Sequence, residues 1–169
     1  MMKQLTIPTI LQEQESFTSA FWQVYIDGAS RNNPGPSGAG ICLKRNQEIV
    51  AEYGFYVGKK TNNQAEYFAL LFGLMLVLPE LQEEDKLEIV SDSELLVRQI
   101  KGIYKVKNPD LQKMHQVAKK MLEGSSYTIR HVLRSDNQDA DRLANVAVDK
   151  KIAPPLVYVE QLRSYGITI

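Results

Sequence analysis

Several residue types that carry chemistry in other proteins are scarce in this chain of 169 residues. It contains one cysteine, Cys42, and two histidines, His115 and His131. A single cysteine excludes an internal disulfide and a cysteine-rich zinc site, and two separated histidines are too few for a histidine metal site. Any metal bound here must therefore be a hard cation held by oxygen ligands.

Long apolar runs and net charge are lacking as well. The longest apolar run, residues 67–78, is shorter than the roughly 20 residues that cross a bilayer, and residues 1–14 have no apolar core of signal-peptide length. The 20 basic and 20 acidic side chains cancel, so no overall basic field indicates a nucleic-acid partner, although a neutral total can hide one basic and one acidic face. We expect a cytoplasmic monomer with no membrane partner.

The hydrophobic pattern predicts one domain with the element order β-β-β-α-β-α-α-β-α. Three consecutive strands followed by strands that alternate with helices favour an α/β fold, a mixed sheet with helices on both faces. The expected strands are 23–27, 40–44, 49–57, 87–90 and 127–132, and the expected helices are 61–78, 94–100, 109–122 and 136–150. A turn dense in Gly, Asn, Pro and Ser is expected at 28–38. Residues 1–20 are expected to form a loose N-terminal extension, and residues 152–169 a C-terminal tail with a strand-like run at 156–159. The domain is then 21–151.

Four carboxylates stand at the ends of these predicted elements. Asp27 ends the first strand, Asp92 follows the fourth, and Glu66 and Asp141 lie in the first turns of two helices. Any one of them alone is explained as a helix cap or a strand-end aspartate. Four together at one sheet edge would repel each other unless a cation or shared protons offset their charge. Oxygen ligands without His or Cys select Mg²⁺ or Mn²⁺, and two such ions can act on a phosphodiester.

Four segments of the chain resemble, in order, the motifs of type 1 ribonucleases H. The resemblance covers residues 24–148, and although any one motif is weak, the set of four is strong. The segments are Tyr25–Gly40 (YIDGASRNNPGPSGAG), Thr61–Glu66 (TNNQAE), Val90–Ser93 (VSDS) and Asp139–Asn145 (DADRLAN). The resemblance implies a ribonuclease H-like fold with a five-stranded sheet, three strands antiparallel and two parallel.

The resemblance also implies an activity and the residues that carry it. The expected enzyme is an endoribonuclease that cuts the RNA strand of an RNA–DNA hybrid and leaves 5′-phosphate and 3′-hydroxyl ends. Asp27, Glu66, Asp92 and Asp141 would form a catalytic quartet that binds two Mg²⁺ ions, with Mn²⁺ as a substitute.

The residues expected to hold the substrate lie in two places. A protein that recognises an RNA–DNA hybrid contacts the nucleic-acid backbone and the 2′-hydroxyl rather than the base edges. By resemblance, these contacts come from the loop after Asp27 and from the start of the helix at 61–78, a natural anion site. The residues are Gly28, Ser30, Asn33, Thr61, Asn62 and Asn63. The simpler alternatives are a plain turn for the loop and helix capping alone for Thr61 to Asn63.

The chain departs from several bacterial relatives in two places. They carry a longer loop before the last helix, with a mobile histidine, whereas this chain is shorter there, as in archaeal-type members. Arg134 then falls in the loop and would assist by contacting the product phosphate; His131 takes that role only if no residues are deleted.

Residues 102–109 also replace a basic, tryptophan-containing protrusion of those relatives. We therefore expect modest, salt-sensitive substrate binding, in which Lys105 and Lys107 either take part or are simply solvated.

Two other classes of function remain open at this point. One is a non-catalytic nucleic-acid-binding module on the same fold, which the intact quartet disfavours. The other is a nuclease of the wider superfamily that acts on DNA or on double-stranded RNA. The TNNQAE segment and the loop after Asp27 favour the hybrid over DNA, while double-stranded RNA shares the A-like geometry of a hybrid.

Overall fold

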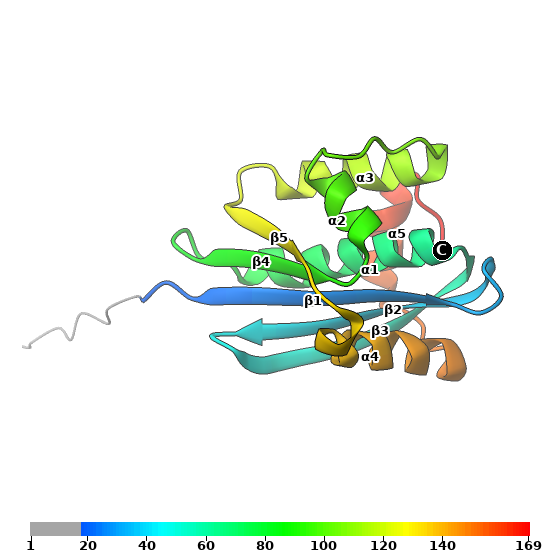
Figure 1. Cartoon of the computed structure of the whole chain (residues 1–169), viewed down its shortest axis with the longest axis horizontal. Helices are drawn as coiled ribbons and strands as arrows, with labels where there is room; N and C mark the ends of the chain where they lie inside the picture. Colours follow the sequence, from blue (N-terminus) through cyan, green and yellow to red (C-terminus); the bar gives the residue numbers. More distant parts are fainter. Residues whose placement is uncertain (1–17) are drawn as a thin grey trace, which may run out of the picture.

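The computed structural model describes residues 18–169 and confirms the expected order of elements, with one helix added near the C-terminus (Figure 1). The strands are β1 (Phe21–Ser30), β2 (Gly35–Arg45), β3 (Glu48–Lys60), β4 (Lys86–Ser91) and β5 (Tyr127–His131). The helices are α1 (Asn62–Val77), α2 (Glu94–Ile100), α3 (Pro109–Leu122), α4 (Gln138–Lys150) and α5 (Leu156–Ser164), with short 3₁₀ turns at Leu78–Glu80 and Arg134–Asp136. Of the extension expected at 1–20, residues 1–17 lie outside the described residues. Ala20 is buried, and its N–H donates to Asp85 Oδ1 at 2.7 Å.

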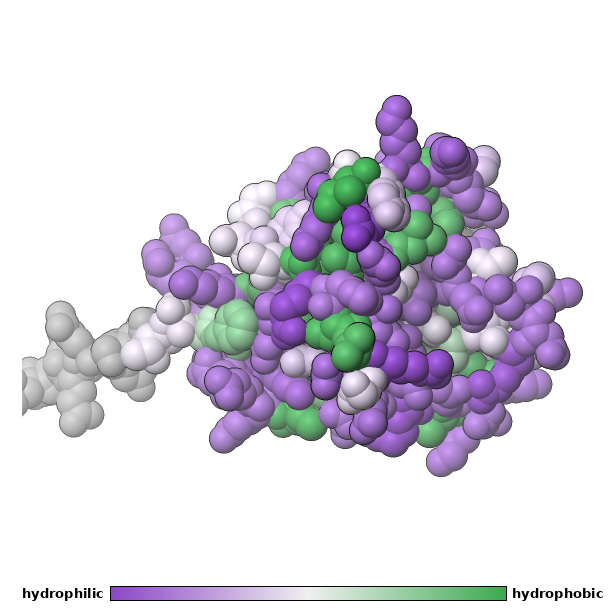
Figure 2. All heavy atoms as spheres, viewed as in Figure 1, coloured by the Kyte–Doolittle hydropathy of each residue, from purple (hydrophilic) through white to green (hydrophobic). Residues whose placement is uncertain are grey.

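The five strands form one mixed sheet in the order β3-β2-β1-β4-β5. β1, β2 and β3 pair antiparallel, whereas β4 and β5 add in parallel to β1. α4 packs against β1, β2 and β3 on one face, and α1 packs on the opposite face with α3 beyond it (Figure 1). The view in Figure 2 is mostly hydrophilic, with apolar residues in separate groups. Within residues 18–169, no helix has both the length and the apolar character needed to span a membrane.

The strand-like run expected at residues 156–159 is wrong, because these residues begin α5. Tyr158 of α5 packs against Phe55 and Phe72, at ring-centroid distances of 6.4 and 6.3 Å. Leu162 and Ile167 are buried in the main core. β-branched residues favour strands only weakly, and packing against a helix and an aromatic cluster overrides that preference.

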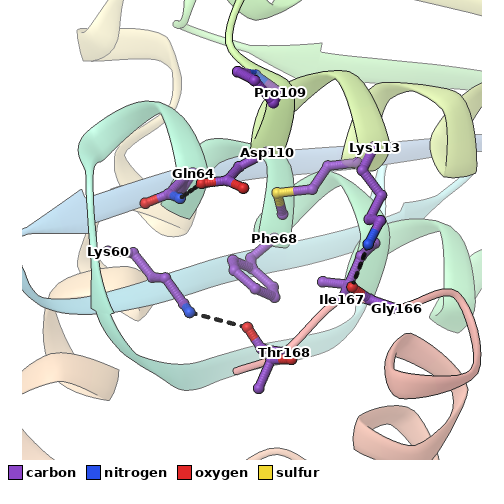
Figure 3. A pocket seen from close by; sticks show the side chains of 10 residues that line it. Lys60, Gln64, Phe68, Pro109, Asp110, Lys113, Gly166, Ile167 and Thr168 are labelled. Atoms are coloured by element: carbon purple, nitrogen blue, oxygen red, sulfur yellow. Dashed lines mark hydrogen bonds between the residues drawn. The ribbon is translucent and has the colours of Figure 1, made fainter.

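The end of the chain is held by two lysine ammonium groups from other elements (Figure 3). Lys60 Nζ donates to the carbonyl oxygen of Thr168, and Lys113 Nζ donates to that of Gly166, both at 2.9 Å. The segment 152–169 therefore packs on β3, α1 and α3 instead of extending away from them.

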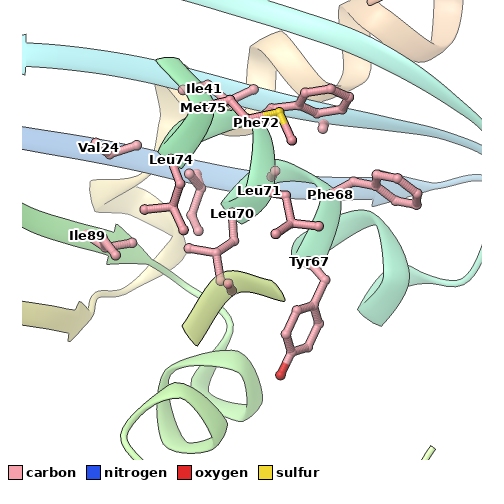
Figure 4. Packing of buried hydrophobic residues seen from close by; sticks show 14 of the residues in the cluster. Val24, Ile41, Tyr67, Phe68, Leu70, Leu71, Phe72, Leu74, Met75 and Ile89 are labelled. Carbon is pink, nitrogen blue, oxygen red and sulfur yellow. The ribbon is translucent and has the colours of Figure 1, made fainter. Parts of the chain in front are cut away.

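The buried helix α1 supplies more of the core than any other element that the structure describes, as its nearly continuous apolar sequence predicts (Figure 4). Leu70, Leu71 and Leu74 are buried among side chains of β1, β2 and β4, such as Ile41 and Ile89. The sheet covers one side of α1 and the helices α2 and α3 cover the other. The hydroxyl of buried Tyr67 donates to Gln99 Oε1 at 2.8 Å, which satisfies its polar end. α1 is therefore fixed from both sides.

α4 approaches the sheet closely because glycines face it. A Cβ on Gly40 of β2 would overlap the carbonyl oxygen of Ala140, and one on Gly54 of β3 would overlap that of Leu143. Gly40 is paired with Asp27 across the β1–β2 ladder. The glycines thus let α4 lie close to the sheet, and this distance determines where Asp141 lies relative to Asp27.

The turn expected at residues 28–38 is much shorter in the structure. β1 continues to Ser30 and β2 begins at Gly35, so that Gly28 pairs with Ala39 and Ser30 pairs with Ser37. Glycine, proline and serine indicate irregular backbone, but they do not reveal that a paired strand lies opposite. The pairing extends the hairpin beyond Asp27.

A matched pair of leucine substitutions in α5 tests whether the C-terminal segment belongs to the core. Leu162 is fully buried, whereas Leu156 on the same helix is 67% exposed. We expect Leu162→Ala to lower the free energy of unfolding by about 2–5 kcal/mol, since it leaves a cavity. Leu156→Ala should change it by no more than about 0.5 kcal/mol. Urea unfolding measures both, and equal effects would show that α5 is not part of the core.

Candidate active site

Three carboxylates meet at the carboxyl ends of β1 and β4. Asp27 lies in β1 and Asp92 directly follows β4, its parallel neighbour, while Glu66 projects from the first turns of α1. One oxygen from each carboxylate lies within 4.8 Å of the others. Gly28 makes this approach feasible, because a Cβ there would overlap the backbone nitrogen of Glu66.

Two of these acids, Asp27 and Glu66, lie in surroundings that disfavour their negative charge. Burial, together with the nearby charges of Asp92 and Asp141, raises the pKa of Asp27 to about 8. Burial also raises the pKa of Glu66 well above its usual range, and the neighbouring Asp27 and Asp92 add to the shift. Among the described residues, the buried Glu66 Oε2 has no hydrogen-bond partner. A carboxylate oxygen left unpartnered beside two other acids fits a bound divalent cation, since charge of opposite sign would offset the repulsion.

Asp141 of α4 lines the same cleft but stands apart from the compact group of three. Its Oδ1 accepts a hydrogen bond of 2.6 Å from the guanidinium of Arg134, which lies in the 3₁₀ turn before α4 and is largely exposed. The cleft has a volume of about 370 Å³. The structure therefore brings all four predicted acids and Arg134 to one cleft.

His131, the alternative to Arg134, ends β5 outside this cleft. Its Nε2 lies 3.2 Å from the carbonyl oxygen of Asp92. The side chain is exposed and is not among the residues that line the cleft. Placing His131 on a strand agrees with the shortened loop expected from the sequence.

The predicted substrate-binding residues divide into two groups. Gly28, Ser30 and Asn62 line the cleft, and the Ser30 hydroxyl donates to the carbonyl oxygen of Lys60 at 2.8 Å. Thr61, Asn33 and Asn63 do not line it.

Two residues of the second group organise the start of α1. The Thr61 hydroxyl accepts from the Gln64 N–H at 3.2 Å, and the Gln64 side chain accepts from the Thr61 N–H, which completes a capping box. Asn33 Oδ1 accepts from the Asn62 N–H at 2.9 Å. Capping is thus present at this helix end.

Two asparagines that sequence reasoning did not single out support the acids. Asn137 is buried, and its Nδ2 donates to the carbonyl oxygen of Ile26 and to Asp92 Oδ1, both at 2.9 Å. Asn145 Nδ2 donates to the carbonyl oxygen of Asp141 at 2.8 Å. An asparagine before a helix suggests an N-cap, yet Asn137 makes no side-chain cap bond. Its contacts with Ile26 and Asp92 therefore could not be predicted from the local sequence.

The comparisons with known proteins cover the part of the chain that carries these four acids. The model of a family described as reverse transcriptase-like matches residues 25–147. Ribonuclease HI of Halobacterium salinarum is 41% identical over 127 residues, which cover 74% of this chain. The chain belongs to the ribonuclease H family. It spans 63% of the halobacterial relative and 35% of a bifunctional protein of Mycobacterium tuberculosis to which it is 38% identical.

Solved structures of the ribonuclease H family share the fold. The crystal structure of the Halobacterium salinarum ribonuclease H1 superposes with a TM-score of 0.72 at 40% identity and covers 77% of this chain and 98% of its own. A ribonuclease H1 isolated from compost, crystallised in complex with an RNA/DNA hybrid, gives a TM-score of 0.72 at 34% identity, covering 79% and 99%. In this chain residues 101–108 connect α2 directly to α3.

The raised pKa of Asp27 predicts how stability varies with pH when no metal is bound. Its folded value of about 8 exceeds its ordinary value of 3.8, so the unfolded chain loses the proton first. The stability due to the protonated group is therefore complete below about pH 4, falls as pH rises and is lost above about pH 8.

Unfolding by urea in EDTA, at about pH 5, 7 and 9, should show this decline in the wild type. Asp27→Asn should flatten the decline, because no proton is released. Asp139→Asn removes a partly exposed acid of α4 and should retain the wild-type slope. If Asp27→Asn and the wild type had the same slope, the raised pKa would not belong to Asp27.

Proposed function

We propose that this protein is an endoribonuclease that hydrolyses the RNA strand of RNA–DNA hybrids and leaves 5′-phosphate and 3′-hydroxyl ends. The observation that carries the proposal is the group of three carboxylates with an unpartnered Glu66 oxygen. A family relationship to ribonuclease H and a fold shared with a hybrid-bound ribonuclease H1 support the choice of substrate. Residues 21–151 would form the catalytic domain.

Asp27, Glu66, Asp92 and Asp141 would hold two divalent cations, which would be Mg²⁺ ions with Mn²⁺ as a substitute. The donor set fits, because all four side chains offer only oxygen and the nearest three are close enough to share an ion. When bound, such cations lower the pKa of water and offset negative charge that develops on phosphate oxygens.

Protein groups around the acids would keep them in position while the substrate binds. The Asn137 amide holds Asp92 Oδ1 against the backbone of β1, so this carboxylate keeps its orientation as charge in the site changes. Without substrate, the Arg134 guanidinium neutralises Asp141. Because Arg134 is exposed and lies on a short turn, it can exchange this carboxylate for the phosphate of the product and assist its release.

Substrate choice would come from the backbone rather than from base edges. Gly28, Ser30 and Asn62 place small or polar groups along the cleft, which suits contact with a sugar and a phosphate. Because residues 101–108 form no protrusion, binding should be modest and should weaken with salt.

The direct test compares cleavage of matched RNA–DNA, RNA–RNA and DNA–DNA duplexes with Mg²⁺ and with EDTA. We expect the RNA strand of the hybrid to be cut only with the metal, and the DNA duplex to be spared because it lacks the 2′-hydroxyl. Asp92→Asn should reduce hybrid cleavage by about three orders of magnitude or more, since one metal ligand is lost. Asp139→Asn serves as the matched control and should cut at the wild-type rate.

Three outcomes would contradict the proposal. An Asp92→Asn protein that cuts within tenfold of the wild type would remove the carboxylates from the chemistry. Equal nicking of the DNA duplex would favour a DNA nuclease, and tight hybrid binding without any cleavage would favour a non-catalytic module.

Arg134 and His131 can be separated by their effects on turnover. Arg134→Ala should lower kcat by about tenfold while the Mg²⁺ concentration for half-maximal activity changes less, because the guanidinium contacts phosphate and not metal. His131→Ala should have little effect, because this side chain lies outside the cleft. Steady-state rates over a range of Mg²⁺ concentrations measure both. Loss of activity in the His131 variant alone would reverse the two roles.

A further inference from the structure

Arg31 stands at the rim of the cleft and has no role in the function described so far. It directly follows β1 and lines the cleft together with Asp27 and Asp141. Its backbone N–H donates to the carbonyl oxygen of Pro36 at 2.9 Å, so the base of the residue is fixed by the β1–β2 hairpin. The side chain crosses to α4, the helix that carries Asp141.

Two hydrogen bonds fix the guanidinium of Arg31 on α4. One nitrogen donates to Asn145 Oδ1 at 2.6 Å and another to Asp149 Oδ1 at 3.0 Å. Asn145 is held in turn, because its Nδ2 donates to the carbonyl oxygen of Asp141. The guanidinium is therefore tied to the backbone of a proposed metal ligand. It has more N–H donors than these two bonds use.

The ion pair with Asp149 does not by itself account for this arrangement. The side chains of Arg31 and Asp149 are 43% and 66% exposed, and such exposed pairs contribute little to stability. Arg142, which lies on α4 like Asp149, forms a comparable exposed pair with Glu52 of β3, but Arg142 does not line the cleft. What distinguishes Arg31 is its placement beside the acids.

The charges of the cleft leave Arg31 as the cation available to a substrate. Four acids line the cleft, and Arg31 and Arg134 are the two cationic residues among its described lining. Arg134 is bonded directly to the carboxylate of Asp141. Among the residues that line the cleft, Arg31 donates a side-chain hydrogen bond to the neutral amide of Asn145, and its acidic partner Asp149 lies outside the cleft. A polyanion entering this acidic cleft needs a compensating positive charge.

We propose that Arg31 binds a phosphate of the RNA strand next to the phosphate that is cut. The inference rests on the proposed function and adds a residue that sets affinity and the position of the strand. A guanidinium held by its own hydrogen bonds is preorganised for the oxygens of a phosphate. Such a contact places the backbone and does not read the bases.

Hybrid binding in an inactive background tests this contact apart from cleavage. Anisotropy of a labelled RNA–DNA duplex would be measured with Mg²⁺ for Asp92→Asn alone and combined with Arg31→Ala, Arg31→Lys or Arg142→Ala. We expect Arg31→Ala to raise Kd about tenfold, as for loss of one charge-assisted hydrogen bond. The slope of log Kd against log salt should fall by about 0.7–0.9, the value for one phosphate contact.

The other variants separate a substrate contact from a structural role. Arg31→Lys should keep the salt slope of the Asp92→Asn parent because it keeps the charge, while Arg142→Ala should leave both Kd and slope unchanged. A Kd for Arg31→Ala equal to that of Arg142→Ala would overturn the proposal. So would a weaker Kd with an unchanged salt slope, because this is the result of local distortion and not of a lost phosphate contact.

A single uncharged methylphosphonate identifies the strand. Placed beside the cut position in the RNA strand, it should weaken binding by the parent protein and have no further effect in Arg31→Ala. The same pattern from the DNA strand alone would overturn the assignment to RNA. If the wild type did not cut hybrids at all, the proposed function would fall, while these binding measurements would still decide whether Arg31 contacts a phosphate.

Discussion

Mutual repulsion among buried carboxylates is the constraint around which this fold is arranged. Asp27 and Glu66 both have raised pKa values because they are buried and because other acids lie beside them. This charge is unfavourable to the folded state unless protons or cations offset it. The rest of the molecule must therefore hold the acids in place against their own repulsion. A cation that enters the cleft would offset this repulsion.

Two helices meet this demand in different ways. α1 is buried between the sheet and other helices, so its apolar side chains fix the backbone from which Glu66 projects. α4 rests on glycines of β2 and β3, which let its backbone approach the sheet and bring Asp141 to the same cleft. Buried Asn137 then joins α4 to both β1 and Asp92. Core packing and one polar side chain together position the acids that repel.

Much of this architecture follows from local sequence. The continuous apolar segment of α1, the alternation of the strands and the acids at their ends predict the layers and the edge where Asp27, Glu66 and Asp92 meet. They do so because hydrophobic period and chain direction are local properties that fix which face is buried and which end of a strand carries a residue. The motif resemblance added Arg134, which no periodicity indicates. Helix α5 was missed because its β-branched residues favour a strand until they are packed.

The sequence by itself determined the type and order of the main elements and the set of acids. Only the tertiary structure decided which polar groups support those acids. Asn137 contacts Ile26, and Arg31 contacts Asn145, across more than a hundred residues of chain. The role that local sequence indicates for each, a helix cap for Asn137 and an exposed charge for Arg31, differs from the role that it has in the fold. The physical reason is that hydrogen bonding and burial depend on which segments are adjacent in space. Here α4 becomes adjacent to β1 because the glycines of β2 and β3 let it pack closely on the sheet.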